Sequence, residues 1–147
     1  MRGVHSALRA GGRFAAAVWG SAKEVPFISV AGATLRRELD LPSPDPDEPG
    51  PFRLQDTDVL IAILADVGFC DVTTEPFTVH MEFDSPEHYV QFITDISSPA
   101  RKQLDKADDP TQKRLLDAIA VEAGAFASAD GRVRFENRVI CTSGLRG

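Results

Sequence analysis

The sequence has few cysteines, no long apolar run and no excess of basic residues. Two cysteines, Cys70 and Cys141, are too few for a disulfide framework and lack the spacing of a zinc site, so we expect a reducing, cytoplasmic location. No apolar run reaches the roughly 20 residues that a membrane span needs, so we expect no membrane partner. With 22 acidic and 16 basic residues the net charge is −6, which argues against a nucleic-acid partner.

The 147 residues fit one domain, 1–147, and a composition of 43% hydrophobic and 26% charged residues is typical of a globular protein. Five prolines alternate with acidic residues in the segment 42–53, which is too stiff and too polar to join a sheet. We predict a proline-rich surface loop there, with a linker between two domains as the alternative.

Apolar periodicity and capping residues predict alternating strands and helices. The clearest helix begins at Asp56 or Thr57 and ends at Gly68, and another begins at Ser85 with Pro86 in its first turn. The predicted elements are a strand over 14–19, a helix over 21–39 interrupted near Pro26, a helix over 56–68, a strand over 69–83, inserted helices over 85–127 and a closing strand over 133–141.

The first predicted strand, Phe14–Trp19, is apolar at every position. It lacks the alternation of a half-exposed antiparallel strand, so we expect a central, parallel-type strand that is covered on both faces. A parallel sheet needs several such strands, and the sequence contains one. We therefore expect Phe14–Trp19 to leave an open edge that requires a protein partner, self-association or a longer chain.

Two segments carry a resemblance to a known family. Residues 8–20 (LRAGGRFAAAVWG) resemble the segment through the fifth strand of class I S-adenosylmethionine-dependent methyltransferases, where a leucine, a basic residue and two glycines precede an apolar strand. Residues 64–72 (LADVGFCDV) are similar to the family's late helix, which ends in Gly-Phe, one variable residue and Asp-Val. With Phe83–Glu87 following in order, the chain resembles the C-terminal half of a type 11, quinone-biosynthesis-like methyltransferase.

The resemblance implies a fold and a function. The fold class is α/β, the C-terminal part of a Rossmann-like sheet with strands in the order fifth, seventh, sixth: one parallel-type strand, a final antiparallel pair and the inserted helices 85–127. The implied function is the substrate-side portion of an S-adenosylmethionine-dependent enzyme that methylates a small-molecule acceptor.

The sequence departs from this family at the cofactor site. It contains no G-x-G, the pattern that lets a backbone approach the cofactor closely after the first strand. We therefore expect that the chain alone does not bind S-adenosylmethionine, and we assign no cofactor-binding or catalytic residue. The alternatives are a non-catalytic interaction module that completes its sheet with another chain, or a truncated gene product.

The candidate substrate-side residues follow the first strand. Trp19 and Ser21 stand where that strand ends, at the rim that faces the ligand crevice in open α/β sheets, and Phe27 follows as an apolar lid. A place in the core is an equal alternative for Trp19. Of the three histidines, we expect His80 and His88 to be solvated, and His5 has no evident partner. The acidic residues 45–48 and 105–109 lack the spacing of a calcium loop, so we expect no metal site.

Overall fold

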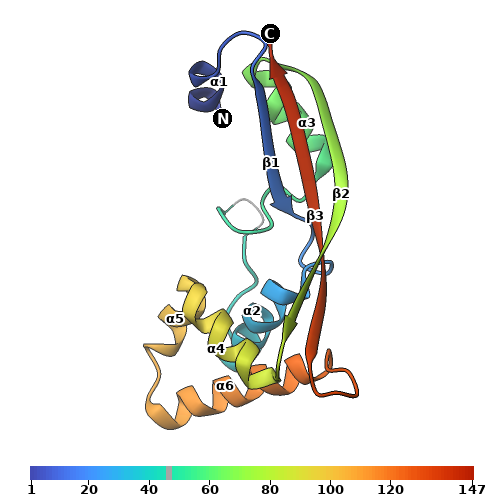
Figure 1. Ribbon diagram of the computed structural model, residues 1–147. Helices are drawn as coiled ribbons and strands as arrows, with labels where there is room; N and C mark the ends of the chain where they lie inside the picture. Colours follow the sequence, from blue (N-terminus) through green and yellow to red (C-terminus); the bar gives the residue numbers. More distant parts are fainter. Residues whose placement is uncertain (46–47) are drawn as a thin grey trace. The chain divides into compact units, whose positions relative to one another are not determined.

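The computed structural model describes residues 1–45 and 48–147, and Pro46 and Asp47 of the predicted 42–53 loop lie outside the described residues (Figure 1). The remaining described residues of that loop belong to no helix or strand. The helices are α1 (Arg2–Ala7), α2 (Pro26–Glu38), α3 (Thr57–Val67), α4 (Pro86–Ile96), α5 (Ser98–Leu104) and α6 (Asp109–Gly124), and the strands are β1 (Arg13–Trp19), β2 (Phe69–Phe83) and β3 (Val133–Arg146).

The three strands form one sheet in the order β1-β3-β2, with the last strand of the chain in the middle (Figure 1). β1 pairs antiparallel to β3 from Arg13 opposite Leu145 to Trp19 opposite Val139. β2 and β3 also run antiparallel, because the cross-strand pairs Glu82–Arg134 and His80–Glu136 advance in opposite directions along the two strands. The class is therefore α/β, and the predicted final antiparallel pair is confirmed.

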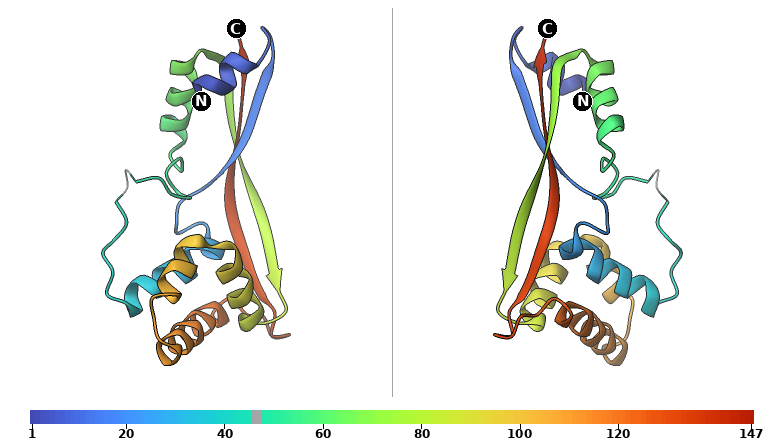
Figure 2. Two further views of the ribbon diagram at one scale, coloured as in Figure 1. Left: turned by 90° about the vertical axis from the view of Figure 1, so that its left-hand side faces the viewer. Right: turned by 90° about the vertical axis from the view of Figure 1, so that its right-hand side faces the viewer.

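The described residues divide into two compact units, and each is considered by itself. Unit 1 consists of residues 1–24, 48–79 and 137–147, and unit 2 of residues 25–45 and 80–136. Figure 2 gives two further views, in which α3 lies beside the strands of unit 1 and α2, α4, α5 and α6 gather in unit 2. No helix of the described residues is long and apolar enough to cross a bilayer.

Unit 1 packs α3 against one face of the sheet. Leu60 and Leu64 of α3 are buried against Phe69 of β2 and Ile140 of β3. The predicted ends of this helix are confirmed: the Asp56 side chain accepts hydrogen bonds from two backbone N–H groups of the first turn, and Gly68 follows the helix with a φ of 106°.

The other face of β1 is open, and here the sequence-based expectation is wrong. Phe14, Ala16 and Val18 are half-buried on the α3 side of the sheet, whereas Ala15 and Ala17 are exposed on the opposite side. The strand is thus an antiparallel edge strand with one covered face. Alanine side chains are small enough to be tolerated on either face, which is why the apolar run did not reveal the alternation.

Unit 2 packs its helices around the parts of β2 and β3 that belong to it, residues 80–83 and 133–136. Its fully buried side chains include Tyr89 of α4, Leu115 and Ile119 of α6, and Phe135 of β3. The predicted start of α4 is confirmed, since the Ser85 hydroxyl accepts a hydrogen bond in the first turn and proline follows it. The segment 85–127 is helical as expected, in the form of α4, α5 and α6.

Candidate functional site

The end of β1, where the sequence predicts a ligand-facing rim, is held by backbone hydrogen bonds. The Gly20 N–H donates to the Arg138 carbonyl at 2.9 Å, and the Arg138 N–H donates to the Glu24 carbonyl at 2.9 Å. A Cβ on Gly20 would lie 3.1 Å from both the Arg138 Cβ and the Glu24 Oε2. A larger residue at this position would therefore have to displace the Arg138 or Glu24 side chain by a few tenths of an ångström.

Ser21 and Glu24 close the turn after β1 with hydrogen bonds to each other. The Ser21 hydroxyl and backbone N–H donate to Glu24 Oε2 at 2.8 and 3.1 Å, and Arg138 Nε lies 3.6 Å from Glu24 Oε1. The Ser21 hydrogen bonds, helped by the charge of Arg138, lower the pKa of Glu24. We did not predict this pair, although the spacing Ser-x-x-Glu is a sequence signal for it. No sequence pattern around Arg138 predicts its contact with Glu24.

The three candidate substrate-side residues do not share one environment. Trp19 is half-buried at the end of β1, opposite Val139, and Ser21 follows in the same unit. Phe27 belongs to unit 2, where it is 3% exposed and packs against other aromatic rings. The structure therefore brings Trp19 and Ser21 to one strand end and places Phe27 inside a hydrophobic core.

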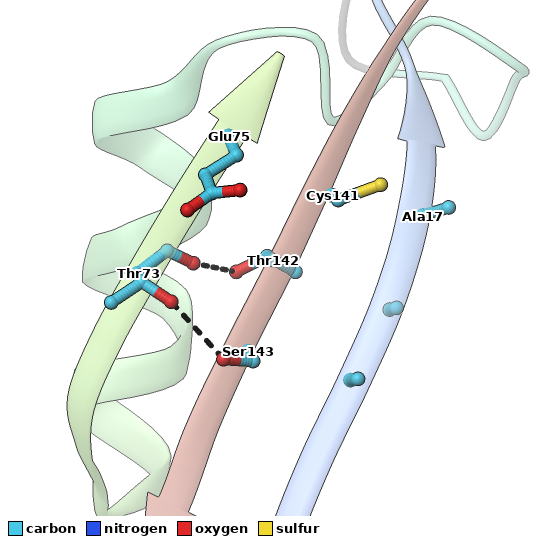
Figure 3. A pocket seen from close by; sticks show the side chains of 8 residues that line it. Ala17, Thr73, Glu75, Cys141, Thr142 and Ser143 are labelled. Atoms are coloured by element: carbon cyan, nitrogen blue, oxygen red, sulfur yellow. Dashed lines mark hydrogen bonds between the residues drawn. The ribbon is translucent and has the colours of Figure 1, made fainter. Parts of the chain in front are cut away.

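A shallow hollow of about 450 Å³ lies on the open face of the sheet in unit 1 (Figure 3). We call it the sheet hollow. It is lined by small side chains and one carboxylate: Ala15, Ala16, Ala17, Thr73, Glu75, Cys141, Thr142 and Ser143. The Thr73 and Ser143 hydroxyls are hydrogen-bonded at 3.1 Å, and the Thr142 hydroxyl donates to the Thr73 carbonyl at 3.1 Å. The hydroxyls are engaged within the protein, and the hollow is open to solvent.

The densest charge cluster lies in unit 2, around the turn before β3. Arg134 contacts Asp130 and Glu82 at 2.7 and 2.6 Å, and Arg132 contacts Asp84 at 3.1 Å and also Glu82. The hydrogen bond from Arg134 is the main cause that lowers the pKa of Asp130 to about 2. Two guanidinium groups face three carboxylates, so the cluster keeps a net charge of only −1 and serves to join β2 to β3.

Each of the three histidines has its own contacts. His5 Nε2 lies 3.3 Å from the Gly68 carbonyl oxygen, and its ring meets the edge of Phe69. His80 is exposed beside Glu136 on the sheet, and His88 Nδ1 accepts from the Asp84 N–H at 3.3 Å. His5 thus has a partner that the sequence did not indicate.

No group of three or more histidine, cysteine, aspartate or glutamate side chains in residues 1–45 and 48–147 is arranged to hold a metal ion. No protein-family model matches the sequence, and no match was found among curated proteins. The function of the chain is therefore inferred from its own topology and side chains.

Proposed function

We propose that the chain forms the substrate-side part of a methyltransferase-type α/β domain and contributes to binding a small-molecule acceptor. The observation that supports this best is the strand order β1-β3-β2, with β3 antiparallel to its neighbours. The resemblance of residues 8–20 and 64–72 implies that order, because the family's seventh strand lies between the fifth and the sixth. Strands joined by simple hairpins would instead follow one another in chain order.

The S-adenosylmethionine site belongs, in this proposal, to another polypeptide segment. The described residues do not fit this cofactor: Gly20 directly follows β1, but its surroundings are filled by Arg138 and Glu24. Cofactor sites in such folds need a glycine turn with free space above it. We therefore derive no catalytic step through S-adenosylmethionine from this chain.

The remaining part of the sheet would join at β1. A parallel neighbour along the β1 edge would turn the antiparallel three-stranded sheet into the mixed sheet that the resemblance implies. The opposite edge, β2, contains Pro76, which cannot donate a ladder hydrogen bond and is typical of edge strands. Of the two edges of the described sheet, β1 is therefore the one suited to extension.

In this arrangement Trp19 forms part of the acceptor wall at the rim. The Ser21–Glu24–Arg138 network fixes the turn beside it, so the indole is presented from a rigid support. An apolar wall without a catalytic dyad suits methyl transfer, where orientation and exclusion of water provide most of the effect.

The test compares the chain alone with the chain in a complex isolated from its host. Calorimetric titration with S-adenosylmethionine is expected to show no binding by the chain alone and micromolar binding by the complex. Micromolar binding by the chain alone would contradict the assignment of the cofactor site to another segment. The matched control is the Ala17→Pro variant, which is expected to lose the complex because proline blocks the β1 edge.

A non-catalytic interaction module is the second candidate, and the open β1 edge favours it specifically. An exposed edge without protective charges is a template for strand addition by a partner. This candidate predicts that a host complex forms, depends on Ala17 in the same way, and does not bind S-adenosylmethionine. The same titration therefore separates the two functions.

A further inference from the structure

The backbone of β1 presents hydrogen-bonding groups to an unoccupied side of the described sheet. In an antiparallel pair of strands, every second residue directs its N–H and C=O groups toward the neighbouring strand. The Gly20 N–H, just after β1, donates to the Arg138 carbonyl of β3. The even-numbered residues of β1 therefore direct their backbone groups toward β3. The odd-numbered residues direct theirs the other way. Ala15 and Ala17, both with exposed side chains, are the centre of this outward row.

The β1 edge carries none of the usual devices that prevent strand addition. It has no proline, bulge or lysine, and its one charged side chain, Arg13, lies at the end of the strand. On β2, by contrast, Pro76 interrupts the donors and Asp71 has a positive φ of 50°. The β1 edge is thus the exposed template of this sheet.

We propose that β1 pairs with β1 of a second copy of this chain, antiparallel and about a twofold axis through Ala16. Ala16 is the middle residue of Arg13–Trp19, so this register is the one that pairs the whole strand. Ala15 then lies opposite Ala17 of the second copy, and each such pair exchanges two backbone hydrogen bonds. The two three-stranded sheets become one continuous sheet.

The side chains of β1 are self-complementary in this register. Arg13 is placed opposite Trp19 of the second copy. In the single chain its guanidinium donates to the Ser143 hydroxyl at 3.2 Å, and by turning across the edge it would form a favourable cation–π contact with that indole. The alanines meet at the centre without steric conflict. The two Arg13 residues are separated by six residues of extended strand, about 20 Å, which exceeds the screening length of about 8 Å at physiological salt.

This dimer goes beyond the proposed function and uses the same edge. A second copy and a cofactor-binding segment would compete for β1, so the dimer is a resting form that sheet completion must open. Its tests use the chain alone, without S-adenosylmethionine. If the chain alone forms no dimer, the expected S-adenosylmethionine binding by the host complex is unaffected. If the host complex binds no S-adenosylmethionine, the expected dimer of the chain alone is unaffected.

The first test is sedimentation velocity of the full chain over a range of concentrations. The wild type is expected to form dimers, and Ala17→Pro to be monomeric, because proline removes an outward N–H without removing a bond to β3. Arg13→Glu is expected to weaken the dimer about tenfold through its two symmetry-related contacts, whereas Arg9→Glu, the control, leaves it unchanged. A wild type that stays monomeric at about 100 µM (a Kd near 10⁻⁴ M is about −5.5 kcal/mol) would overturn the proposal.

The second test measures the register and does not depend on proline. Across the axis Ala16 faces Ala16 of the second copy in a non-hydrogen-bonded pair, with Cα atoms about 4.5 Å apart, within disulfide range. With Cys70 and Cys141 replaced by serine, Ala16→Cys is expected to form a cross-linked dimer under mild oxidation. Ala15→Cys is expected to cross-link far less, because residue 15 lies opposite residue 17 of the second copy and only diagonally from residue 15 of that copy. Equal cross-linking of both variants, or none by Ala16→Cys, would overturn the register and with it the proposal.

Discussion

Replacing Phe27 by alanine distinguishes a substrate lid from a core residue. The Phe27 side chain is 3% exposed, and its ring centroid lies 6.1 to 6.5 Å from those of four neighbours. Those neighbours are Phe83, Tyr89, Phe92 and Phe135. The Phe27 carbonyl also accepts a hydrogen bond from the Tyr89 hydroxyl at 2.9 Å. A side chain in this position stabilises unit 2 and has little surface to offer to a ligand.

We expect Phe27→Ala to lower the free energy of unfolding by about 3 to 5 kcal/mol, the range for a buried phenylalanine, because rigid aromatic neighbours cannot close the cavity. That is a large part of the roughly 5 to 15 kcal/mol by which domains are stable. Urea unfolding followed by far-ultraviolet circular dichroism measures the difference. Phe77→Ala is the matched control: this phenylalanine is 60% exposed, and its loss should cost less than about 0.5 kcal/mol.

A loss of less than about 1 kcal/mol in the free energy of unfolding of Phe27→Ala would refute the core placement, since a cavity in a packed core cannot be that small in its effect. Such a result would return Phe27 to the role of an accessible lid.

Three further predictions concern stability. Asp56→Ala should lower the free energy of unfolding by about 1 kcal/mol through loss of the α3 cap, as measured by urea unfolding; an unchanged midpoint would exclude the cap. Tyr89→Phe should cost about 1 kcal/mol by the same measurement, because the hydrogen bond from the buried Tyr89 hydroxyl to the Phe27 carbonyl is lost, and an unchanged free energy of unfolding would contradict a stabilising role for that bond. The pKa of Asp130 is lowered to about 2 by the hydrogen bond from Arg134, so its stabilising contribution is complete above the ordinary value of 3.8 and is lost as pH falls toward 2. Arg134→Gln should flatten the pH dependence of the thermal midpoint in that window, and a profile identical to the wild type would contradict the assignment.

Local signals in the sequence predicted both ends of α3 and the start of α4, but not the bounds of α1. These helix ends depend on interactions within one turn, so they can be predicted without knowledge of the rest of the fold. They are the α3 cap at Asp56, the end of α3 at Gly68 and the Ser85–Pro86 start of α4. The strand order was reached through the resemblance, because no local pattern states which strands become neighbours.

The sequence was less informative about which faces of β1 are buried and about the residues at the end of that strand. Three central alanines of β1 are compatible with a buried or an exposed face, so the expected cover on both sides did not follow from them. For Phe27 a usable signal was present: with Ala31 and Leu35 it repeats every four residues, which indicates the inward stripe of α2. Arg138 reaches Glu24 only through the register of β1 and β3, which is a property of the folded sheet.

Amide hydrogen exchange along β1 tests the central claim, that this strand is an open edge with alternate residues directed outward. In a dilute sample of the chain alone, the N–H groups of Ala15 and Ala17 should exchange rapidly while those of Phe14, Ala16 and Val18 are protected by β3. Protection at Ala15 and Ala17 should rise with concentration. Equal and concentration-independent protection of all five amides would show that the edge is already covered and would contradict the account.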